Sequence, residues 1–207
     1  MSTQYPWDTF FKEKSIQVFQ AGKNIYDIGE GLRARPNSGS RFDEGRIWLQ
    51  EYIAKVDYKV IDPVPDYKPD IVGDIHELPL NDNSVDGIFC LAVLEHVHNP
   101  FKAMDEMYRV LRPGGRLLIY VPFLYYYHAH QGYYKDYWRY THDGLEELAK
   151  PFARFEMQSV RGRFETLVRL SPLGRLKIWI NFARVVDRIF PKPSSRQVSG
   201  YYLYLEK

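Results

Sequence analysis

The segment IYDIGEGLRARPNSG (residues 25–39) begins as a nucleotide-binding loop does and then departs from that pattern. A short apolar run ends in Asp27, and Gly29 and Gly31 follow in the spacing D-x-G-x-G. Glycines at such positions let the backbone turn sharply and approach a ligand closely. Arg33 stands where a third glycine is expected. The segment therefore favours a strand that runs into a cofactor loop of unusual outline, with a decayed cofactor site as the alternative.

Short apolar strands and helical patterns alternate on both sides of this loop. Strands are expected over residues 24–28, 58–62, 70–74, 85–91, 116–121, 155–160 and 201–206. Helices are expected over residues 6–20, 42–55, 100–111, 141–152 and 175–190. Asn99 and Thr141 are the expected caps of two of them, and the helix over 42–55 should bury Ile47 and Trp48. This alternation indicates an α/β fold with a mostly parallel sheet and helices on both faces.

Length and composition fit a single domain over residues 1–207, with 45% hydrophobic residues. The one cysteine, Cys90, excludes an internal disulfide framework. Residues 1–15 lack the cationic start and apolar block of a signal peptide, and no run reaches the ~18 apolar residues that span a bilayer. We therefore expect a soluble, cytoplasmic protein.

The charge of the chain is unevenly distributed. Residues 1–100 hold 10 Lys and Arg against 16 Asp and Glu, and residues 101–207 hold 18 against 10. Such asymmetry can mark an anionic partner. We prefer to interpret the uneven charge as a solvated basic face.

Acidic and small residues follow four of the expected strands. Asp62 ends the second strand, where a carboxylate can accept both hydroxyls of a ribose. Asp74 and Ile75 follow the third, where a carboxylate could accept from an exocyclic amine and the next N–H could reach a ring nitrogen. The fourth ends at Leu91, ahead of Glu95. Because ligands bind at the carboxyl ends of parallel strands, these residues should converge on one crevice.

Taken together, these segments resemble the class I S-adenosylmethionine (SAM)-dependent methyltransferases, and among them the broad small-molecule branch. The residues that carry the resemblance are DIGEG…VIDP…GDIHELPLNDNSVDGIFCLAVLEHVHNP…EMYRVLRPGGRLLIYVPF. The resemblance is strongest over residues 73–123, looser over 24–72 and faint after about residue 150. It implies a Rossmann-like, doubly wound sheet of seven strands with a final antiparallel strand, which YYLYLE (201–206) would supply.

The resemblance also implies roles for single residues. On the family's pattern, Asp27, Gly29 and Gly31 would frame the methionine part of SAM. Asp62 would hold the ribose, and Asp74 and Ile75 would hold the adenine. Leu91 would line the wall of the crevice. LEH (94–96) resembles a family motif whose role we take as mainly structural, and a catalytic His96 is the alternative.

Glu30 departs from the family's usual small residue at its position. Its charge would disfavour a methionine carboxylate unless it points away or binds the amino group. Arg33, Arg35 and Arg41 could offset that carboxylate, although we favour solvated loop charges.

The stretch PFLYYYHAHQGYYKDYWRYTHDGL (122–145) is rich in aromatic residues, and we expect a lid over residues 122–141. It resembles the H…DYWR-T--GL part of methyltransferases found with sugar and polysaccharide biosynthesis. The expected catalytic residues are His128 and His130, as base candidates, with Asp136 as orienter. The expected acceptor contacts are Tyr127, Tyr134 and Arg139. H-x-H with an acid can also hold a metal, but the sequence supplies no recognisable further ligand, and we expect none.

Residues 175–190 (RLKIWINFARVVDRIF) predict a basic amphipathic helix. Its polar stripe would contain Lys177, Asn181, Arg184 and Arg188. We expect its apolar face to pack on the domain or on a second copy of the chain. Peripheral contact with an anionic membrane is the alternative.

These observations predict a SAM-dependent methyltransferase that methylates an oxygen of a sugar, a glycan precursor or a similar small molecule. Two rivals stay open: N- or C-methylation of another metabolite, such as a quinone precursor, and a catalytically inactive binding or scaffold protein of the same fold. We do not expect nucleic acid as the partner, because no N/D-P-P-Y/F-type motif follows the fourth strand.

Overall fold

The computed structural model describes residues 5–36, 42–191 and 195–207, which build one seven-stranded sheet. The strands lie in the order β3-β2-β1-β4-β5-β7-β6. Their bounds are β1 Asn24–Ile28, β2 Asp57–Asp62, β3 Ile71–Val72, β4 Val85–Leu91, β5 Leu111–Pro122, β6 Arg154–Val160 and β7 Gly200–Glu206. Strands β1 to β5 pair in parallel, and β7 lies antiparallel between β5 and β6. The expected Rossmann-like sheet with a final antiparallel strand is confirmed.

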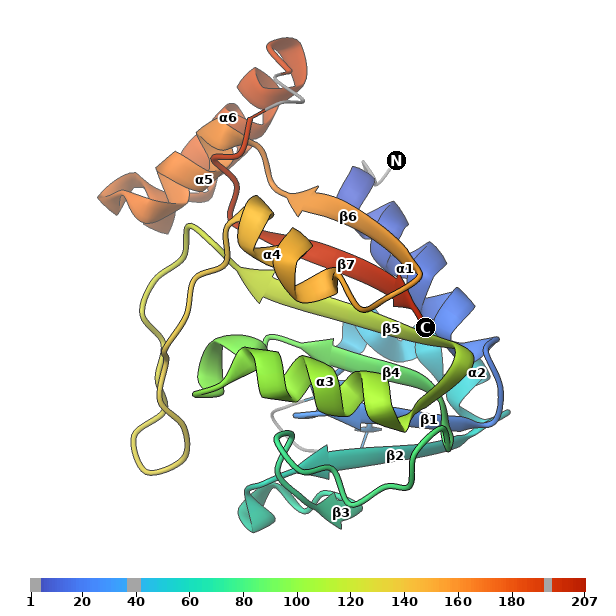
Figure 1. Ribbon diagram of the computed structural model, residues 1–207. Coiled ribbons are helices and arrows are strands. Elements are labelled where there is room, and N and C mark those ends of the chain that lie inside the picture. Colours follow the sequence, from blue (N-terminus) through green and yellow to red (C-terminus); the bar gives the residue numbers. More distant parts are fainter. Residues whose placement is uncertain (1–4, 37–41, 192–194) are drawn as a thin grey trace.

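Helices cover both faces of the sheet (Figure 1). Their bounds are α1 Pro6–Phe19, α2 Gln50–Ile53, α3 Pro100–Val110, α4 His142–Ala149, α5 Arg163–Leu170 and α6 Lys177–Ile189. One core joins α3 and α4 to the sheet through residues such as Met107, Leu145 and Ile88. The other joins α1 to the opposite face through Phe19 and Phe89. Because Ile88 and Phe89 are neighbours on β4 that point to opposite cores, this central strand is buried along its whole length.

Local sequence signals set several helix ends. The side chain of Asn99 accepts a hydrogen bond from the backbone N–H of Lys102, and Pro100 occupies the first position of α3. The hydroxyl of Thr141 accepts from the N–H of Gly144 at the start of α4. Both expected caps are confirmed.

The helix expected over residues 42–55 is shorter than predicted. Asp43 begins a 3₁₀ segment, η2 (Glu44–Leu49), and only the four residues of α2 continue as α-helix. Gly45 in the first turn weakens helix formation. The tighter winding turns Ile47 outward, 64% exposed, and buries Leu49 in its place, so the predicted burial of Ile47 was wrong.

The carboxyl ends of the parallel strands lie at one edge of the sheet, and the lid segment (residues 123–141) leaves β5 at that edge (Figure 1). Helices α5 and α6 lie beyond the same edge, because α5 begins three residues after β6 ends. This edge therefore carries the features that bear on function.

Candidate active site

A cavity of about 910 Å³ opens at the carboxyl ends of β1, β2 and β4, under the lid segment. Its sheet side is formed by Ile28 and Gly29 at the end of β1, Asp62 at the end of β2, and Ala92 and Val93 after β4. The lid side holds Tyr127, His130, Tyr133, Tyr134 and Tyr137. Its volume lies at the upper end of the roughly 300–1,000 Å³ that small-molecule sites occupy.

Asp27 shapes the β1 loop from beneath and does not line the cavity. Its carboxylate accepts hydrogen bonds from the N–H groups of Gly31 and Leu32, each 3.1 Å away, and from the hydroxyl of Tyr58 at 2.7 Å. Complete burial raises the pKa of Asp27 to about 7, although these donors favour the charged form. The residue therefore fixes the loop that follows it, and its fully buried side chain has no surface in the cavity.

The two glycines of the loop have different reasons to be glycine. Gly29 has φ +76° and lines the cavity, and a Cβ there would lie 2.5 Å from Cγ2 of Val93. A Cβ on Gly31 would lie 2.3 Å from the carbonyl oxygen of Leu91. Gly29 thus brings backbone to the cavity, and Gly31 lets the loop pack on β4.

Leu91, expected in the crevice wall, does not line the cavity. Its side chain is 6% exposed and belongs to the core on the α1 face. Ala92, with φ +57°, and Val93 take its place. The left-handed turn at Ala92 redirects the chain after the strand.

The acidic residue of the loop points away from the cavity. Glu30 is 1% exposed, and its Oε1 lies 2.7 Å from Nε of Arg35. Arg35 also reaches Asp70, at 3.4 Å. The predicted conflict with a ligand carboxylate is therefore absent at Glu30. Arg33 is exposed, and Arg41 lies outside the described residues.

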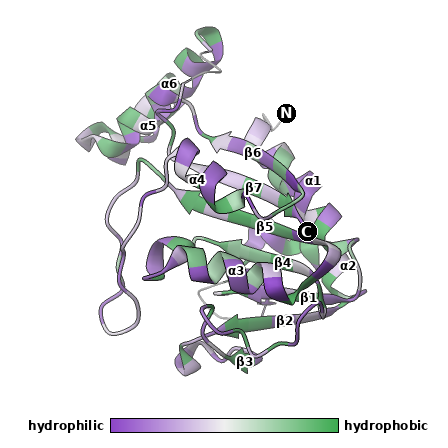
Figure 2. Ribbon diagram, viewed as in Figure 1, coloured by the Kyte–Doolittle hydropathy of each residue, from purple (hydrophilic) through white to green (hydrophobic). Residues whose placement is uncertain are grey.

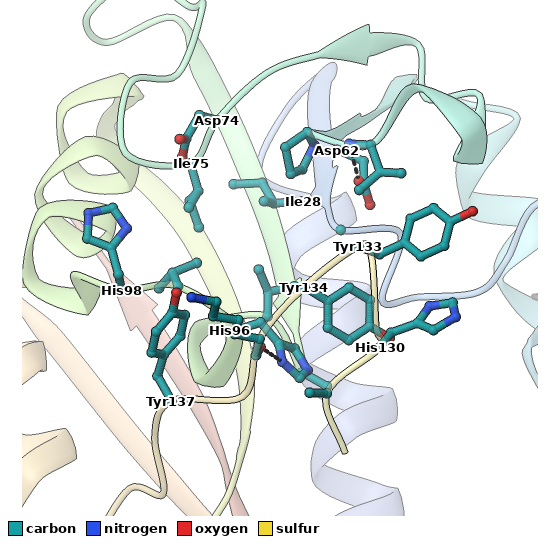
Figure 3. Close-up of a pocket in the computed structure, with 18 of the residues that line it drawn as sticks. Ile28, Asp62, Asp74, Ile75, His96, His98, His130, Tyr133, Tyr134 and Tyr137 are labelled. Carbon is teal, nitrogen blue, oxygen red and sulfur yellow. Dashed lines mark hydrogen bonds between the residues drawn. The ribbon is translucent and has the colours of Figure 1, made fainter. Parts of the chain in front are cut away.

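Asp62 and Asp74 face the cavity on either side of Ile28 (Figure 3). Oδ1 of Asp62 accepts from the N–H of Val64 at 2.8 Å. Oδ1 of Asp74 lies 2.9 Å from the backbone nitrogen and 2.6 Å from Nδ1 of His76. Burial opposes ionisation of Asp74, but the bonds from His76 outweigh it and lower the pKa of the carboxyl. Both carboxylates, with Ile75 beside Asp74, are thus held in fixed positions in the wall.

The lid segment reaches back across the cavity to the residues after β2. Nδ1 of His130 lies 3.1 Å from the hydroxyl of Tyr67, and the ring of Tyr133 stacks on that of Tyr67 with centroids 5.3 Å apart. At its other end the indole N–H of Trp138 donates to the carbonyl of Val97 at 2.8 Å. The lid is therefore tied down on both sides.

The other predicted lid residues lie behind the cavity wall. The guanidinium of Arg139 donates to both carboxylate oxygens of Asp136, at 2.5 and 2.7 Å. Arg139 lowers the pKa of Asp136 to about 2, and the N–H of His128 also donates to that carboxylate. His128, Asp136 and Arg139 thus brace the lid, whereas His130, Tyr127 and Tyr134 line the cavity.

A buried carboxylate joins two of the histidines. Glu95 is fully buried, and its Oε1 lies 3.6 Å from Nε2 of His128 and 3.9 Å from Nε2 of His96. Oε1 of Glu95, with one ring nitrogen of His96 and one of His128, forms a group of donors within 4.8 Å of one another, a spacing that could hold a cation. Glu95 raises the pKa of His128, by charge attraction because the gap is too long for a hydrogen bond.

His96 is the member of this group that lines the cavity (Figure 3). Its Nδ1 lies 2.7 Å from the carbonyl oxygen of Lys135, so Nδ1 carries the proton and donates it. In the neutral form of such a ring the lone pair is on Nε2. The sequence offered LEH as a signal for this residue, but the approach of Glu95 to His128 could not be foreseen from it.

Comparisons with known proteins agree with this architecture. Residues 51–119 match the family model of a methyltransferase domain. An uncharacterised methyltransferase of Mycobacterium bovis is 30% identical over 107 residues, which is 47% of this chain and 39% of the relative. A demethylmenaquinone methyltransferase of Renibacterium salmoninarum is 44% identical over 103 residues, 47% of this chain and 40% of the relative. The chain thus spans about two fifths of the length of these relatives.

Solved structures share the fold over nearly the whole chain. A SAM-dependent methyltransferase from Archaeoglobus fulgidus superposes with a TM-score of 0.58 at 14% identity, covering 96% of this chain and 92% of its own. A Burkholderia thailandensis 1,6-didemethyltoxoflavin N1-methyltransferase, solved with S-adenosylhomocysteine, gives 0.54 at 16% identity, covering 95% and 76%. The chain therefore has the fold of SAM-dependent methyltransferases, and its central segment matches the methyltransferase-domain family model.

Proposed function

We propose that this protein transfers a methyl group from SAM to a small hydroxylated acceptor, with a sugar or glycan precursor as the acceptor class. The proposal rests on one observation: the two sides of the cavity are lined by different kinds of residue. Asp62, Asp74 and Ile75 stand on its sheet side, and aromatic and histidine side chains of the lid stand opposite. One side suits a nucleoside and the other a second, polar ligand.

The sheet side fits the cofactor residue by residue. Asp62 has one oxygen bonded to Val64 and lies where a carboxylate can accept from ribose hydroxyls. Asp74 and Ile75 flank the neighbouring part of the wall, which supports an adenine there in this proposal. Gly29 leaves room for a close approach to its backbone, since a side chain there would strike Val93. SAM, when bound, supplies the electrophilic methyl group.

The lid side fits an acceptor with flat apolar faces and hydroxyl groups. Tyr127, Tyr134 and Tyr137 offer ring faces with polar tips, and His130 adds a ring nitrogen. Such surfaces suit sugar rings and other small polar molecules. The lid braces described above would hold these side chains in place, so that acceptor and methyl donor meet in a fixed orientation.

We assign the base to His96. A sugar hydroxyl must lose its proton as it attacks, and a positioned imidazole can take it. The Nδ1–H of His96 is engaged by Lys135, which leaves Nε2 as the acceptor. His128, in contrast, does not line the cavity, and the nearby Glu95 carboxylate raises its pKa. His96 is therefore preferred to His128 because it reaches the cavity, and His130, which also lines it, is an alternative base.

Methylation of a ring carbon in a quinone precursor is the second candidate. It is favoured by the 44% identity with a demethylmenaquinone methyltransferase over 103 residues. A ring carbon activated by a neighbouring hydroxyl would also need a proton acceptor beside it, so the same histidines would serve.

The test is methyl transfer from labelled SAM to two acceptor panels, nucleotide sugars with glycan precursors and demethylated quinones. We expect transfer to the first panel. Asp62→Ala should weaken SAM binding by ~1–3 kcal/mol, because a charged hydrogen-bond partner is lost. Asp57→Ala, at the opposite end of the same strand, is the matched control and should leave binding unchanged. Transfer to quinones alone would select the second candidate. Binding of SAM without transfer to either panel would favour a scaffold.

A further inference from the structure

Helices α5 and α6 expose an extended apolar surface. Nine apolar side chains of this region are each at least 42% exposed: Leu167, Leu173, Leu176, Ile178, Trp179, Phe182, Val185, Ile189 and Phe190. We call them the α5–α6 apolar surface. Within α6, Ala183 alone is fully buried. Figure 2 shows hydrophobic and hydrophilic residues recurring along α6, which projects beyond the sheet. Apolar patches of this kind mark interaction sites.

The charges around this surface are mostly positive. Residues 161–190 contain seven Arg and Lys and only two acids, Glu165 and Asp187. Glu165 is 1% exposed and pairs with Arg161, Arg169 and Arg184. The carboxylate of Asp187 accepts from the N–H groups of Phe164 and Glu165, at 3.1 and 2.9 Å. Both acids are thus used to hold the helix pair together.

Three of the four remaining cations lie on the outside. Arg175, just before α6, and Lys177 and Arg188, at its beginning and near its end, are exposed. The surface that faces solvent is therefore an apolar strip with Trp and Phe in it, bordered by Lys and Arg.

We propose that the α5–α6 apolar surface docks the protein onto a lipid bilayer that contains anionic lipids. Aromatic and aliphatic side chains on one face, bordered by cations, are the composition of helices that lie in the membrane interface. Anionic headgroups complement these cations, whereas a second copy of this chain would bring like charges together. The 13 residues of α6 are too few to cross a bilayer, and in the described parts of the chain no other helix has the length and hydropathy to do so.

Docking in this way brings the mouth of the cavity toward the lipid. The hydroxyl of Tyr126 in the lid donates to the carbonyl of Arg169 in α5, at 2.8 Å. Tyr127 next to it lines the cavity and is 75% exposed. Tyrosines with apolar rings and polar tips suit the headgroup layer. An acceptor with an apolar tail could then enter the cavity from the bilayer. The docking itself does not depend on the proposed reaction.

The experiment is flotation of the full chain with vesicles of phosphatidylcholine alone or with added phosphatidylglycerol. We expect binding to the anionic vesicles to exceed binding to the neutral ones about tenfold, and to fall as salt rises. Ile178→Ser with Phe182→Ser should abolish it, because the apolar contact is lost. Arg175→Ala with Lys177→Ala should weaken it. The matched control is Val72→Ser with Phe101→Ser, two residues that are 57% and 58% exposed elsewhere on the molecule. Circular dichroism checks that each variant is folded.

Each outcome decides the proposal. Salt-sensitive flotation that only the α5–α6 variants lose supports it. Absence of flotation, or flotation that the control variant loses equally, overturns it. A dimer in solution that Ile178→Ser with Phe182→Ser dissolves, without vesicle binding by the wild type, assigns the surface to a second copy instead. A thermal shift with SAM is measured on the same samples without vesicles, so that failure of docking and failure of the proposed function are told apart.

Discussion

At the scale of single residues, the carboxylate of Glu95 is the most telling group. Within the described residues neither of its oxygens has a hydrogen-bond partner, although the side chain is fully buried. A buried carboxylate without such bonds is costly unless an opposite charge lies near it. His128 at 3.6 Å can supply that charge. The charge of Glu95 therefore acts on the neighbouring histidines, and packing alone does not explain a carboxylate at this position.

The first prediction compares the histidines. His96→Ala should lower turnover by ~10²–10⁴, the usual value of a general base, with SAM affinity nearly unchanged. His142→Ala is the control, since this ring packs near Tyr201, away from the cavity. If His96→Ala turns over like wild type while His130→Ala loses activity, the base is His130. If neither changes turnover, orientation alone accounts for the reaction.

The second prediction concerns the pKa of His128. Glu95→Gln should lower it toward the usual 6.5, because the carboxylate that raises it is neutralised. A pKa raised in the folded state contributes stability that is present below 6.5 and is lost as the pH rises through the folded value. Nuclear magnetic resonance of the imidazole protons measures the shift. An unchanged titration in Glu95→Gln would mean that Asp136 and the carbonyl of Tyr126 hold the proton instead.

At the scale of elements, α5 and α6 form a unit held by polar contacts. Glu165 of α5 binds Arg184 of α6 at 3.0 Å, and Asp187 of α6 caps the N-terminus of α5. The sequence predicted a polar stripe containing Arg184, which instead faces α5. The apolar face of this helix was expected to pack on the domain or on a second copy, but most of it is exposed in the described structure, and polar groups hold α6 to α5.

The third prediction follows from this pairing. Glu165→Ala should lower the free energy of local opening of α5 and α6 by ~1–3 kcal/mol, because three half-exposed arginines lose their common partner. Hydrogen exchange should become faster in both helices while β4 and β5 stay protected. Glu147→Ala on α4, whose partner Lys150 is 68% exposed, is the control and should change stability by less than about 0.5 kcal/mol. Faster exchange throughout the sheet would show that the pair is not an independent unit.

At the scale of the whole molecule, the cavity joins segments from most of the chain. Residues after β1, β2 and β4 meet the lid that follows β5. A ligand bound there contacts the sheet and the lid together, and it binds only the folded state. Occupation of the cavity should therefore stabilise the entire domain.

The fourth prediction measures this effect. SAM at 100 times its Kd should add ~2.7 kcal/mol to the free energy of unfolding. That raises the Tm by roughly 5–10 °C for a domain of this size. Differential scanning calorimetry over a SAM titration measures how the Tm depends on SAM concentration. The Asp62→Ala variant should need a higher SAM concentration for the same rise in Tm. A Tm that does not respond to SAM or to its demethylated product would favour a decayed cofactor site.

The sequence by itself determined the sheet and the order of its elements. Continuous apolar runs such as Val85–Leu91 specify buried strands, and Asn99 and Thr141 mark helix starts through contacts within a few residues. Alternation of strands and helices then restricts the topology, because parallel strands need crossovers of one hand. Asp62 and Asp74 could be placed at the cavity for the same reason, since the carboxyl ends of parallel strands share an edge.

Only the tertiary structure decided which side chains reach the cavity. Asp27 and Leu91 stand at strand ends, yet one turns under its own loop and the other into the core. Glu95 meets His128 because the lid folds back onto the segment after β4, a contact that no local pattern encodes. The exposure of the outward face of α6 is likewise decided by the tertiary structure. Periodicity predicts an amphipathic helix, but the exposure of each face depends on which distant segments cover it, and that is fixed by packing alone.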